Sequence, residues 1–490
     1  MKKFKQILIL ILGLIILPVS CTKDFEEINT DPNNPTDVPS INVIVNVIRL
    51  HTQAYYNDWG DMNEPSSWAN HLGKIQYIDE AAYRFREGTV NGLWANTYLN
   101  LNDLGLIIEK ESRTGGNPNI KAIAMTLRAY IFHMATDRWK DIPYSEAGRG
   151  HQGITTPAYD TQESIYLDLL AQLKAANELY TTAATYAIGS SDVLFGGNII
   201  KWKRFNNSLR LRVAIRMSNV APAIAKTNIE EILTNPATYP IITANADNVY
   251  LWWQATAPYK EPWNSDRTDA GRDDHGMCVT LIDILKDHDD PRLPVYAKPA
   301  AADGEYRGVV SGDLPENVGA LNRISRIGAI FRDVPDGFTP ILRAAEVHFI
   351  IAEAAFKNWN TGGITAQQAY EAGVAASLAE YGLSASYTAY IAQPDIAWNN
   401  QLNQIYHQKW ISLFKNGNEA WAENRRTDYP LLEHAPYSPY FGQHNRPPFR
   451  YPYPVTEINL NKDNIEPKLV GIVDHMWGQK MWWDTRTGVN

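Results

Sequence analysis

Two segments of the chain combine tryptophan with side chains that form hydrogen bonds. The first covers residues 58–63 together with Trp68, and the second covers residues 259–267. The flat apolar face of a Trp or Tyr ring can stack on a sugar ring, while carboxylate, amide and guanidinium groups can hold the hydroxyls around it. The candidate ligand-binding residues are therefore Asp58, Trp59, Asn63, Trp68, Tyr259, Trp263, Asn264 and Arg267.

Trp59 and Trp263 are the residues that we expect to stack on sugar rings. The polar neighbours expected to hold hydroxyls are Asp58, Asn63, Asn264 and Arg267. The alternative for each tryptophan is that it only fastens its loop to the protein core. Trp252 and Trp253 are assigned to packing, because they continue an apolar run that begins at Val249.

Acidic clusters in the same loops raise the alternative of a helical glycosidase, which needs two carboxylates about 5–10 Å apart. One cluster contains Asp58, Asp61 and Glu64, and the other contains Asp266, Asp269, Asp273 and Asp274. Arg267 and Arg272 lie among the acids of the second cluster, and acidic residues in loops usually cap turns or accept hydrogen bonds. We therefore expect a binding protein and not an enzyme.

Motifs for metal or cofactor binding are lacking. The sequence contains no Walker A loop, nucleophile-elbow serine, HExxH motif or metal-binding cysteine pair, and its 11 histidines are scattered without metal-ligand spacing. Residues 148–153 match the glycine spacing of a dinucleotide fingerprint, but Pro143 and Pro157 flank them and indicate a turn-rich loop. We expect no metal and no cofactor, and we expect Cys278 to be a small buried hydrophobic residue.

The elements that must position these side chains are mostly helices. Trp94, Tyr98, Leu101, Leu104 and Ile108 recur at spacings of three and four, which is typical of an amphipathic helix, and residues 342–356 show the same period. Further helices are predicted at about 41–56, 119–136, 161–181, 199–218, 223–234, 277–287, 365–381 and 399–416. The intervening stretches 57–66, 140–159, 235–275, 295–340 and 428–490 are rich in Pro, Gly and Trp, and predict large ordered loops with a few short strands.

Charged residues on these helices predict internal ion pairs. Arg210, Arg212 and Arg216 form a basic stripe on one helix of an acidic protein. Glu346 and Glu353 lie seven residues apart on one face of another helix, and we expect them to pair with arginines such as Arg343.

The N-terminus has the pattern of a secretory signal that ends at a cysteine. Lys2, Lys3 and Lys5 precede an apolar run from residue 7 to residue 17, which is too short to span a bilayer, and Cys21 follows closely. This pattern predicts a bacterial lipoprotein with a signal peptide at residues 1–20 and acyl chains on Cys21. The polar segment 21–40 then forms a tether, and residues 41–490 form one domain.

Composition and charge restrict the partners. Removal of the signal takes away three lysines. Of the 45 basic residues 42 then remain, against 54 acidic ones, and the formal charge changes from −9 to −12. Such a surface repels nucleic acid and anionic membranes, so the membrane is expected to be reached through the lipid alone. The chain also has 15 Trp and 26 Tyr, which suit both cores and sugar rings.

Several segments together resemble the SusD/RagB family of nutrient-binding outer-membrane lipoproteins, in its SusD-like second subgroup. The matching segments are 141–147, 205–212, 345–354, 408–411, 424–427, 450–454 and 482–484. They follow the order of the family over nearly the whole mature chain. Residues 23–27 also resemble the acidic signal that sends such lipoproteins to the cell surface.

This resemblance implies a mainly α fold, with tetratricopeptide-like helix pairs packed against a loop-rich irregular half. It also implies a surface glycan site and a TonB-dependent, SusC-like transporter beneath the protein. In the family an early helical region and a mid-chain loop both face the glycan, and the two aromatic segments fall in comparable positions. Peptide capture, as in the RagB branch, remains an alternative, and so does a structural lid without ligand affinity.

Replacement of Cys21 by Ala is expected to abolish palmitate labelling and to move the protein into the aqueous phase of a detergent partition, because no other residue would carry the acyl chains. Cys278→Ala is the matched control, since it removes the second of the 2 cysteines and should retain both label and membrane fractionation. Retention of the label by Cys21→Ala would contradict the lipoprotein assignment.

Overall fold

The computed structural model describes residues 38–490 except 473 and 475. The signal peptide, Cys21 and nearly all of the tether lie outside the described residues. The structure is mainly helical, with 51% of the residues in helices, which confirms the predicted fold class. No helix within the described part of the chain is long and apolar enough to cross a membrane.

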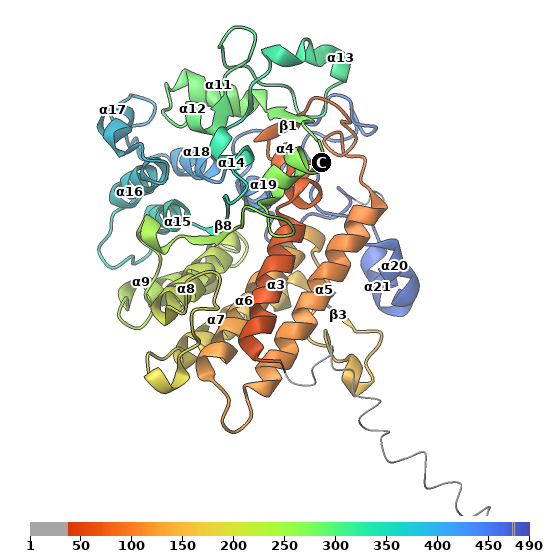
Figure 1. Cartoon of the computed structure of the whole chain (residues 1–490), viewed down its shortest axis with the longest axis vertical. Coiled ribbons are helices and arrows are strands. Elements are labelled where there is room, and N and C mark those ends of the chain that lie inside the picture. The colour runs from red at the N-terminus through yellow and green to blue at the C-terminus, as the bar shows by residue number, and fades with distance from the viewer. Residues whose placement is uncertain (1–37, 473, 475) are drawn as a thin grey trace, which may run out of the picture.

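Long helices that follow one another in the sequence pack side by side and build the larger part of the structure (Figure 1). These helices are α3 (Ser40–Tyr55), α5 (Glu87–Lys110), α6 (Pro118–Trp139), α7 (Gln162–Leu179), α8 (Ile199–Arg216), α9 (Pro222–Thr234), α15 (Ala344–Phe356), α16 (Ala366–Ala379), α18 (Leu402–Ser412) and α19 (Gly417–Thr427). Several of them start at a residue whose side chain caps the helix. Thr365, for example, forms a capping box with Gln368 at the start of α16, and Asn117 caps α6.

Short elements and loops form the second, irregular part. Its helices are α4 (Pro65–Trp68), α10 (Pro262–Thr268), α11 (Val279–Asp287), α12 (Leu293–Tyr296), α13 (Pro315–Val318), α14 (Ala329–Arg332), α20 (Val455–Leu460) and α21 (Lys462–Leu469). The strands pair two by two and antiparallel, as β1 (Leu72–Lys74) with β5 (His275–Met277), β2 (Ile142–Pro143) with β3 (Tyr159–Asp160), β4 (Val249–Trp252) with β8 (Phe338–Leu342), and β6 (Ala297–Lys298) with β7 (Arg326–Ile327). Strands this short are stable only because helices and loops cover them.

Buried ion pairs join α8 to helices that come more than a hundred residues later. The Arg212 guanidinium donates to both carboxylate oxygens of Glu346 on α15, at 2.6 and 2.7 Å. Arg216 donates to Glu423 on α19 at 3.0 Å and also pairs with Glu419. All of these side chains are buried. The predicted role of the basic stripe is therefore confirmed for Arg212 and Arg216.

The partners of the α15 acids differ from the expected ones. Glu353 accepts hydrogen bonds from Arg426 at 2.8 and 2.6 Å, while Arg343 donates to Glu380 at 3.4 Å. Both acids thus pair with arginines, as predicted, but neither pairs with Arg343, because helices that are distant in sequence bring Arg212 and Arg426 closer. The remaining stripe residue, Arg210, pairs with Glu231 on the neighbouring α9.

Truncation of Glu423 to Ala is expected to lower the free energy of unfolding by about 3–5 kcal/mol, because it leaves Arg216, Lys409 and Arg426 buried without their shared carboxylate. The measurement is urea denaturation, monitored by circular dichroism. Glu109→Ala is the control, because Glu109 pairs with Arg113 on the exposed surface and its loss should cost less than about 1 kcal/mol. Equal effects of the two substitutions would contradict a structural role of the buried pairs.

Candidate functional site

Trp59 lies on a five-residue π-helix, Asp58–Met62, which follows directly after α3. The Asn57 side chain caps this π-helix by accepting a hydrogen bond from the backbone N–H of Gly60 at 2.7 Å. Gly60 packs so closely on α3 that a Cβ atom at this position would collide with the carbonyl oxygen of Ala54. This tight turn directs the Trp59 ring outward, and π-helical turns of this kind are frequent at functional sites.

A groove of about 710 Å³ lies on one side of Trp59, between the end of α3 and the start of α5. It is lined by Ala54, Asn57, Trp59, Arg86 and, from the first turns of α5, Glu87, Gly88, Thr89, Gly92 and Leu93. The Arg86 guanidinium lies 5.1 Å from the centre of the Trp59 ring and pairs with the buried carboxylate of Glu80. Both contacts hold Arg86 beside the aromatic face.

A second groove, of about 440 Å³, lies on the other side of Trp59. It is lined by residues of α3 and the π-helix, namely Gln53, Asn57, Asp58 and Trp59, and by Pro258, Lys260, Pro262, Ser265, Asp266, Asp269 and Ala270 from the mid-chain segment. Trp59 and Asn57 belong to both grooves. The two aromatic segments of the sequence therefore meet at this point, although about 200 residues separate them.

Trp59 and Tyr259 keep part of their rings open to solvent, with 37% exposure each. The Arg49 guanidinium of α3 lies 4.3 Å from the centre of the Tyr259 ring and fastens the mid-chain segment to α3. The segment is also closed on itself, because the backbone N–H of Gln254 donates to the carbonyl oxygen of Tyr259 at 2.7 Å. Both rings are thus presented on fixed supports.

Asp58 supplies a carboxylate at the floor of the second groove. Burial, together with the neighbouring negative charge of Asp266, raises the pKa of Asp58 to about 6. Asp266 itself pairs with Arg332 at 2.8 Å, and Lys260 pairs with Asp269 at 2.6 Å. The groove therefore offers hydrogen-bond acceptors, one ammonium group and an aromatic face.

Four of the predicted site residues are buried and serve the core. Trp263 is 0% exposed and packs edge-on against Phe414, so neither face of its ring is open to a ligand. Trp68, Asn63 and Asn264 are also buried, and their polar atoms bond to Glu80, His275 and Arg332 respectively. We therefore correct the predicted site by removing Asn63, Trp68, Trp263 and Asn264 from it.

Arg267 lies outside both grooves. It pairs with Asp333 on the surface, as does Lys298. The assignment of Trp252 to packing is also wrong, because 59% of this residue is exposed, whereas Trp253 is buried and donates to Thr339. Successive side chains of a strand point to opposite faces, so Trp252 and Trp253 cannot share one environment.

The sequence offered little to single out the remaining groove residues, Gln53, Asn57, Arg86 and Lys260. Asn57 alone carried a signal, because an Asn before a Gly-containing turn is a typical capping residue. Arg86 and Lys260 come to the site only through ion pairs with Glu80 and Asp269.

Two buried carboxyl groups lie near Trp59, that of Asp61 within the π-helix and that of Glu64 two residues after it. Burial raises the pKa of Asp61 to about 7 and that of Glu64 to about 8. Neither side-chain oxygen of Glu64 has a hydrogen-bond partner, and Arg138 donates instead to the carbonyl oxygen of Gly60 at 3.0 Å. Both side chains are buried, and neither lines a groove.

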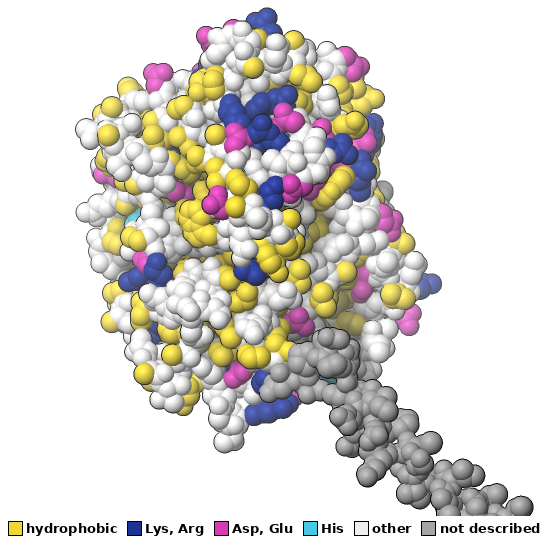
Figure 2. All heavy atoms as spheres, viewed as in Figure 1, with side chains coloured by type: hydrophobic (Ala, Val, Ile, Leu, Met, Phe, Trp, Pro, Cys, Tyr) yellow, Lys and Arg dark blue, Asp and Glu magenta, His cyan; other side chains and the backbone are white. Residues whose placement is uncertain are grey.

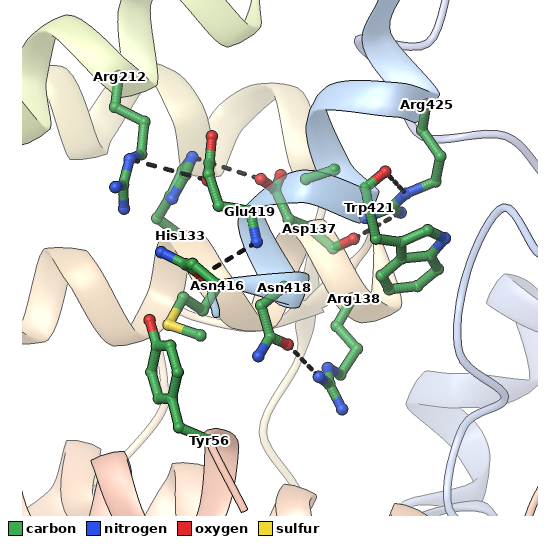
Figure 3. Close-up of a pocket in the computed structure, with 12 residues that line it drawn as sticks. Tyr56, His133, Asp137, Arg138, Arg212, Asn416, Asn418, Glu419, Trp421 and Arg425 are labelled. Carbon is green, nitrogen blue, oxygen red and sulfur yellow. Dashed lines mark hydrogen bonds and ion pairs between the residues drawn. The ribbon is translucent and has the colours of Figure 1, made fainter. Parts of the chain in front are cut away.

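An internal cavity lies deeper, between α6 and α19 (Figure 3). Its volume of about 20 Å³ is enough for a single water but not for a sugar. Arg212, Glu419, His133, Asp137 and Arg425 point into it and are joined by ion pairs and hydrogen bonds, as Figure 3 shows. It belongs to the buried ionic network and is not a ligand site. Among the described residues, no group of His, Cys, Asp and Glu is placed to hold a metal ion.

Comparisons with known proteins identify the family and the fold. The family described as SusD-like, "Starch-binding associating with outer membrane", matches residues 32–454. A chitin-binding SusD homologue from Flavobacterium johnsoniae shares the fold with a TM-score of 0.79 and 26% identity, over 91% of this chain and 98% of the other. SusD homologues from Bacteroides vulgatus (TM-score 0.78, 24% identity, 90% and 97% coverage) and Bacteroides thetaiotaomicron (0.76, 22%, 92% and 100%) have the same fold.

None of the curated proteins matches this sequence. The SusD-like family consists of non-catalytic binding proteins, so the alternative of a helical glycosidase is wrong. The match covers most of the chain, and the resemblance suggested by the sequence motifs is confirmed. This chain is a member of the SusD-like family of binding proteins that associate with the outer membrane.

Proposed function

We propose that this protein captures glycans at the cell surface, and that the two grooves on either side of Trp59 hold them. The observation that carries the proposal is the placement of Trp59, a partly exposed ring that both grooves share and that hydrogen-bonding groups surround. A pyranose ring has an apolar face and a rim of hydroxyls. It therefore matches an aromatic face next to the Asp58 carboxylate, the Asn57 amide and the Lys260 ammonium group.

The names of the relatives support a glycan over a peptide. The family description refers to starch, and one of the structural relatives is a chitin-binding protein. A peptide site would favour backbone groups that extend a strand or a deep enclosed cavity. The grooves at Trp59 are instead open and lined mainly by side chains. Peptide capture remains the second candidate, and the binding measurements below separate the two.

We further propose that acyl chains on Cys21 anchor the protein in the outer membrane with residues 41–490 outside the cell, and that it delivers its glycan to a TonB-dependent, SusC-like transporter. Support comes from the N-terminal pattern and from the family. Purification from native membranes in mild detergent tests the partnership, and elution of the protein alone under every condition would count against a stable complex.

Trp59→Ala is expected to weaken glycan binding by about 1–3 kcal/mol, because it removes the stacking face shared by both grooves. Isothermal titration with oligomers of N-acetylglucosamine and of maltose measures the change. Thermal melting of the same variant should be close to wild type, since part of the ring is solvent-exposed.

Tyr186→Ala is the matched control. Tyr186 has the same 37% exposure as Trp59 but lies outside both grooves, so its removal should leave binding unchanged. Wild-type affinity in Trp59→Ala, or equal losses in both variants, would refute the proposed site. Binding of peptides but of neither sugar series by the wild type would favour the second candidate.

Glycan binding is expected to weaken as the pH falls below about 6, because protonation of Asp58 removes an acceptor for sugar hydroxyls. Above about pH 7 the group is mostly ionised, and affinity should stay constant. Titrations between about pH 5 and about pH 8 measure the profile. Asp58→Asn should bind more weakly at neutral pH and lose the acid-dependent decline, and an unchanged profile in this variant would exclude Asp58 as its source.

A further inference from the structure

Three basic side chains from three different elements meet on the surface of this acidic protein. Lys298 ends β6, Arg326 begins β7, and Arg267 lies near the end of α10. We call these three residues the basic cluster. Their side chains are partly open to solvent, with exposures of 30%, 24% and 40% respectively. Figure 2 shows Lys and Arg side chains gathered beside α12, which leads directly into β6, with acidic side chains among them.

Two members of the cluster are like charges in directly opposite positions. Lys298 and Arg326 are partners in the antiparallel pair of β6 and β7. The other pair of partners, Ala297 and Ile327, is buried, so the two cations share the outer face of the strand pair. Like charges placed opposite each other destabilise a strand pair. Packing therefore does not explain why both of these positions are cationic.

Carboxylates of the protein balance the basic cluster only in part. Asp333 pairs with both Arg267 and Lys298, so one carboxylate serves two cations. The carboxylate partner of Arg326 is Asp273, which lies 3.8 Å away and has a side chain that is 53% exposed. Three positive charges thus share two carboxylates, in a chain whose formal net charge is −9.

The crowding of positive charge acts on the Lys298 ammonium group. Burial lowers the pKa of Lys298, the positive charge of Arg267 also lowers it, and the negative charge of Asp273 acts in the opposite direction. An additional anion next to Lys298 would favour the charged form of the ammonium group and would separate it from the opposing guanidinium. The cluster would therefore gain from one further negative charge.

The guanidinium group of Arg326 is held in a fixed orientation. Its Nη1 donates to the backbone carbonyl oxygens of Asp273 and His275, at 3.0 and 3.1 Å. A guanidinium group is planar, and its fork of N–H donors matches the oxygen atoms of a carboxylate or sulfate group. Because the side chain is already ordered, it loses little conformational entropy when it binds such a group.

Helix α10 connects the basic cluster to the second groove. Ser265 and Asp266 of this helix line the groove, and Arg267 follows them directly. Asp333, the carboxylate that the cluster shares, directly follows Arg332, which is the buried partner of Asp266. The groove and the cluster are therefore attached to the same short helix, and an acidic group on a bound glycan could reach the cluster.

The headgroups of anionic lipids are another source of negative charge, but the placement of the cluster favours the glycan. In Figure 1, helix α3, which follows the proposed tether, begins at the lower end of the molecule. Helices α12 and α14, which flank β6 and β7 in the sequence, lie in the upper half. The cluster thus lies away from the end that the tether joins.

We propose that the basic cluster is a binding site for an oxyanion, and that this anion is a carboxylate or sulfate substituent of the captured glycan. For the molecule that carries the anion, the inference rests on the proposed function. Hydrogen bonds between charged groups are about twice as strong as those between neutral groups. The cluster would accordingly give this protein a preference for acidic glycans over neutral ones.

The test compares glycans that differ only in their substituents. Hexamers of N-acetylglucosamine and of glucose, each in a neutral, a C6-carboxylated and a 6-O-sulfated form, are titrated calorimetrically into wild type, Lys298→Gln and Arg326→Gln. In wild type we expect the carboxylated or the sulfated form to bind about tenfold more tightly than the neutral form. Each substitution should remove most of this preference and leave the affinity for the neutral form unchanged.

A second measurement does not depend on any glycan. Sodium sulfate should raise the melting temperature of wild type more than that of Lys298→Gln or Arg326→Gln, with sodium chloride of equal ionic strength as the reference. Sulfate also stabilises proteins in general, because it is excluded from their surfaces. The matched control is therefore Lys226→Gln, which removes a 46% exposed lysine that pairs with Glu230 on α9 and should respond to sulfate like wild type.

The outcomes separate this inference from the proposed function. If the wild type binds all forms of the hexamers equally, or if both variants keep its preference, the inference is overturned and the proposed function stands. If the wild type binds none of the hexamers, the proposed function fails. A sulfate effect on melting that both variants lose would then still support the anion site, and an equal effect in all four proteins would overturn it.

Vesicles of phosphatidylglycerol test the alternative source of the anion. The expected result is that wild type, Lys298→Gln and Arg326→Gln do not differ in vesicle binding. Vesicle binding that both variants lose, together with equal affinity of the wild type for acidic and neutral hexamers, would assign the cluster to a lipid surface and overturn the assignment to a glycan.

Discussion

The buried ion pairs that link α8, α15, α18 and α19 to one another constrain the rest of this structure. A charge removed from water costs several kcal/mol, which only a well-placed partner can offset. Arg212, Arg216 and Arg426 therefore require that Glu346, Glu419, Glu423 and Glu353 arrive in one geometry. Because these partners come from helices far apart in sequence, few arrangements of the late helices against the early ones satisfy them all.

A short series of contacts connects α19, which belongs to this network, to the ligand grooves. Asn418, near the start of α19, donates to the carbonyl oxygen of Tyr55 at the end of α3, at 2.8 Å. Gly417 packs so closely on Asp61 that a Cβ atom would collide with its carboxyl group. Arg138 bonds to both Asn418 and Gly60. The π-helix that carries Trp59 is thus held from below by the same helix that closes the ionic network.

The carboxyl groups buried next to the site, those of Asp61 and Glu64, are energetically unfavourable. Burial disfavours the charge of both Asp61 and Glu64 and raises their pKa values to about 7 and about 8, and Glu64 has no hydrogen-bond partner to offset this. Unsatisfied polar groups of this kind are concentrated at functional sites, where they accompany a strained backbone. Here Asp61 belongs to the π-helix and Glu64 follows it by two residues, so the outward orientation of Trp59 and the unfavourable burial belong to one local arrangement.

The sequence by itself determined the fold class, the family and the helices with strong apolar period, because periodicity and capping are local and leave their pattern in neighbouring residues. It also indicated that Arg212 and Arg216 would be paired, because arginines on a buried helix face need acids. It did not determine which acids would pair with which arginines. Glu346 pairs with Arg212 and Glu353 with Arg426, and neither pairs with Arg343.

Only the tertiary structure decided which aromatic rings face solvent. Trp59 and Trp263 occur next to polar residues and Trp252 continues an apolar run, yet Trp59 and Trp252 are exposed and Trp263 is buried. Strand alternation predicts that Trp252 and Trp253 lie on opposite faces, but the sequence does not indicate which of the two faces the core. Exposure depends on contacts with residues that are distant along the chain, such as Phe414 beside Trp263, and no local pattern encodes those contacts.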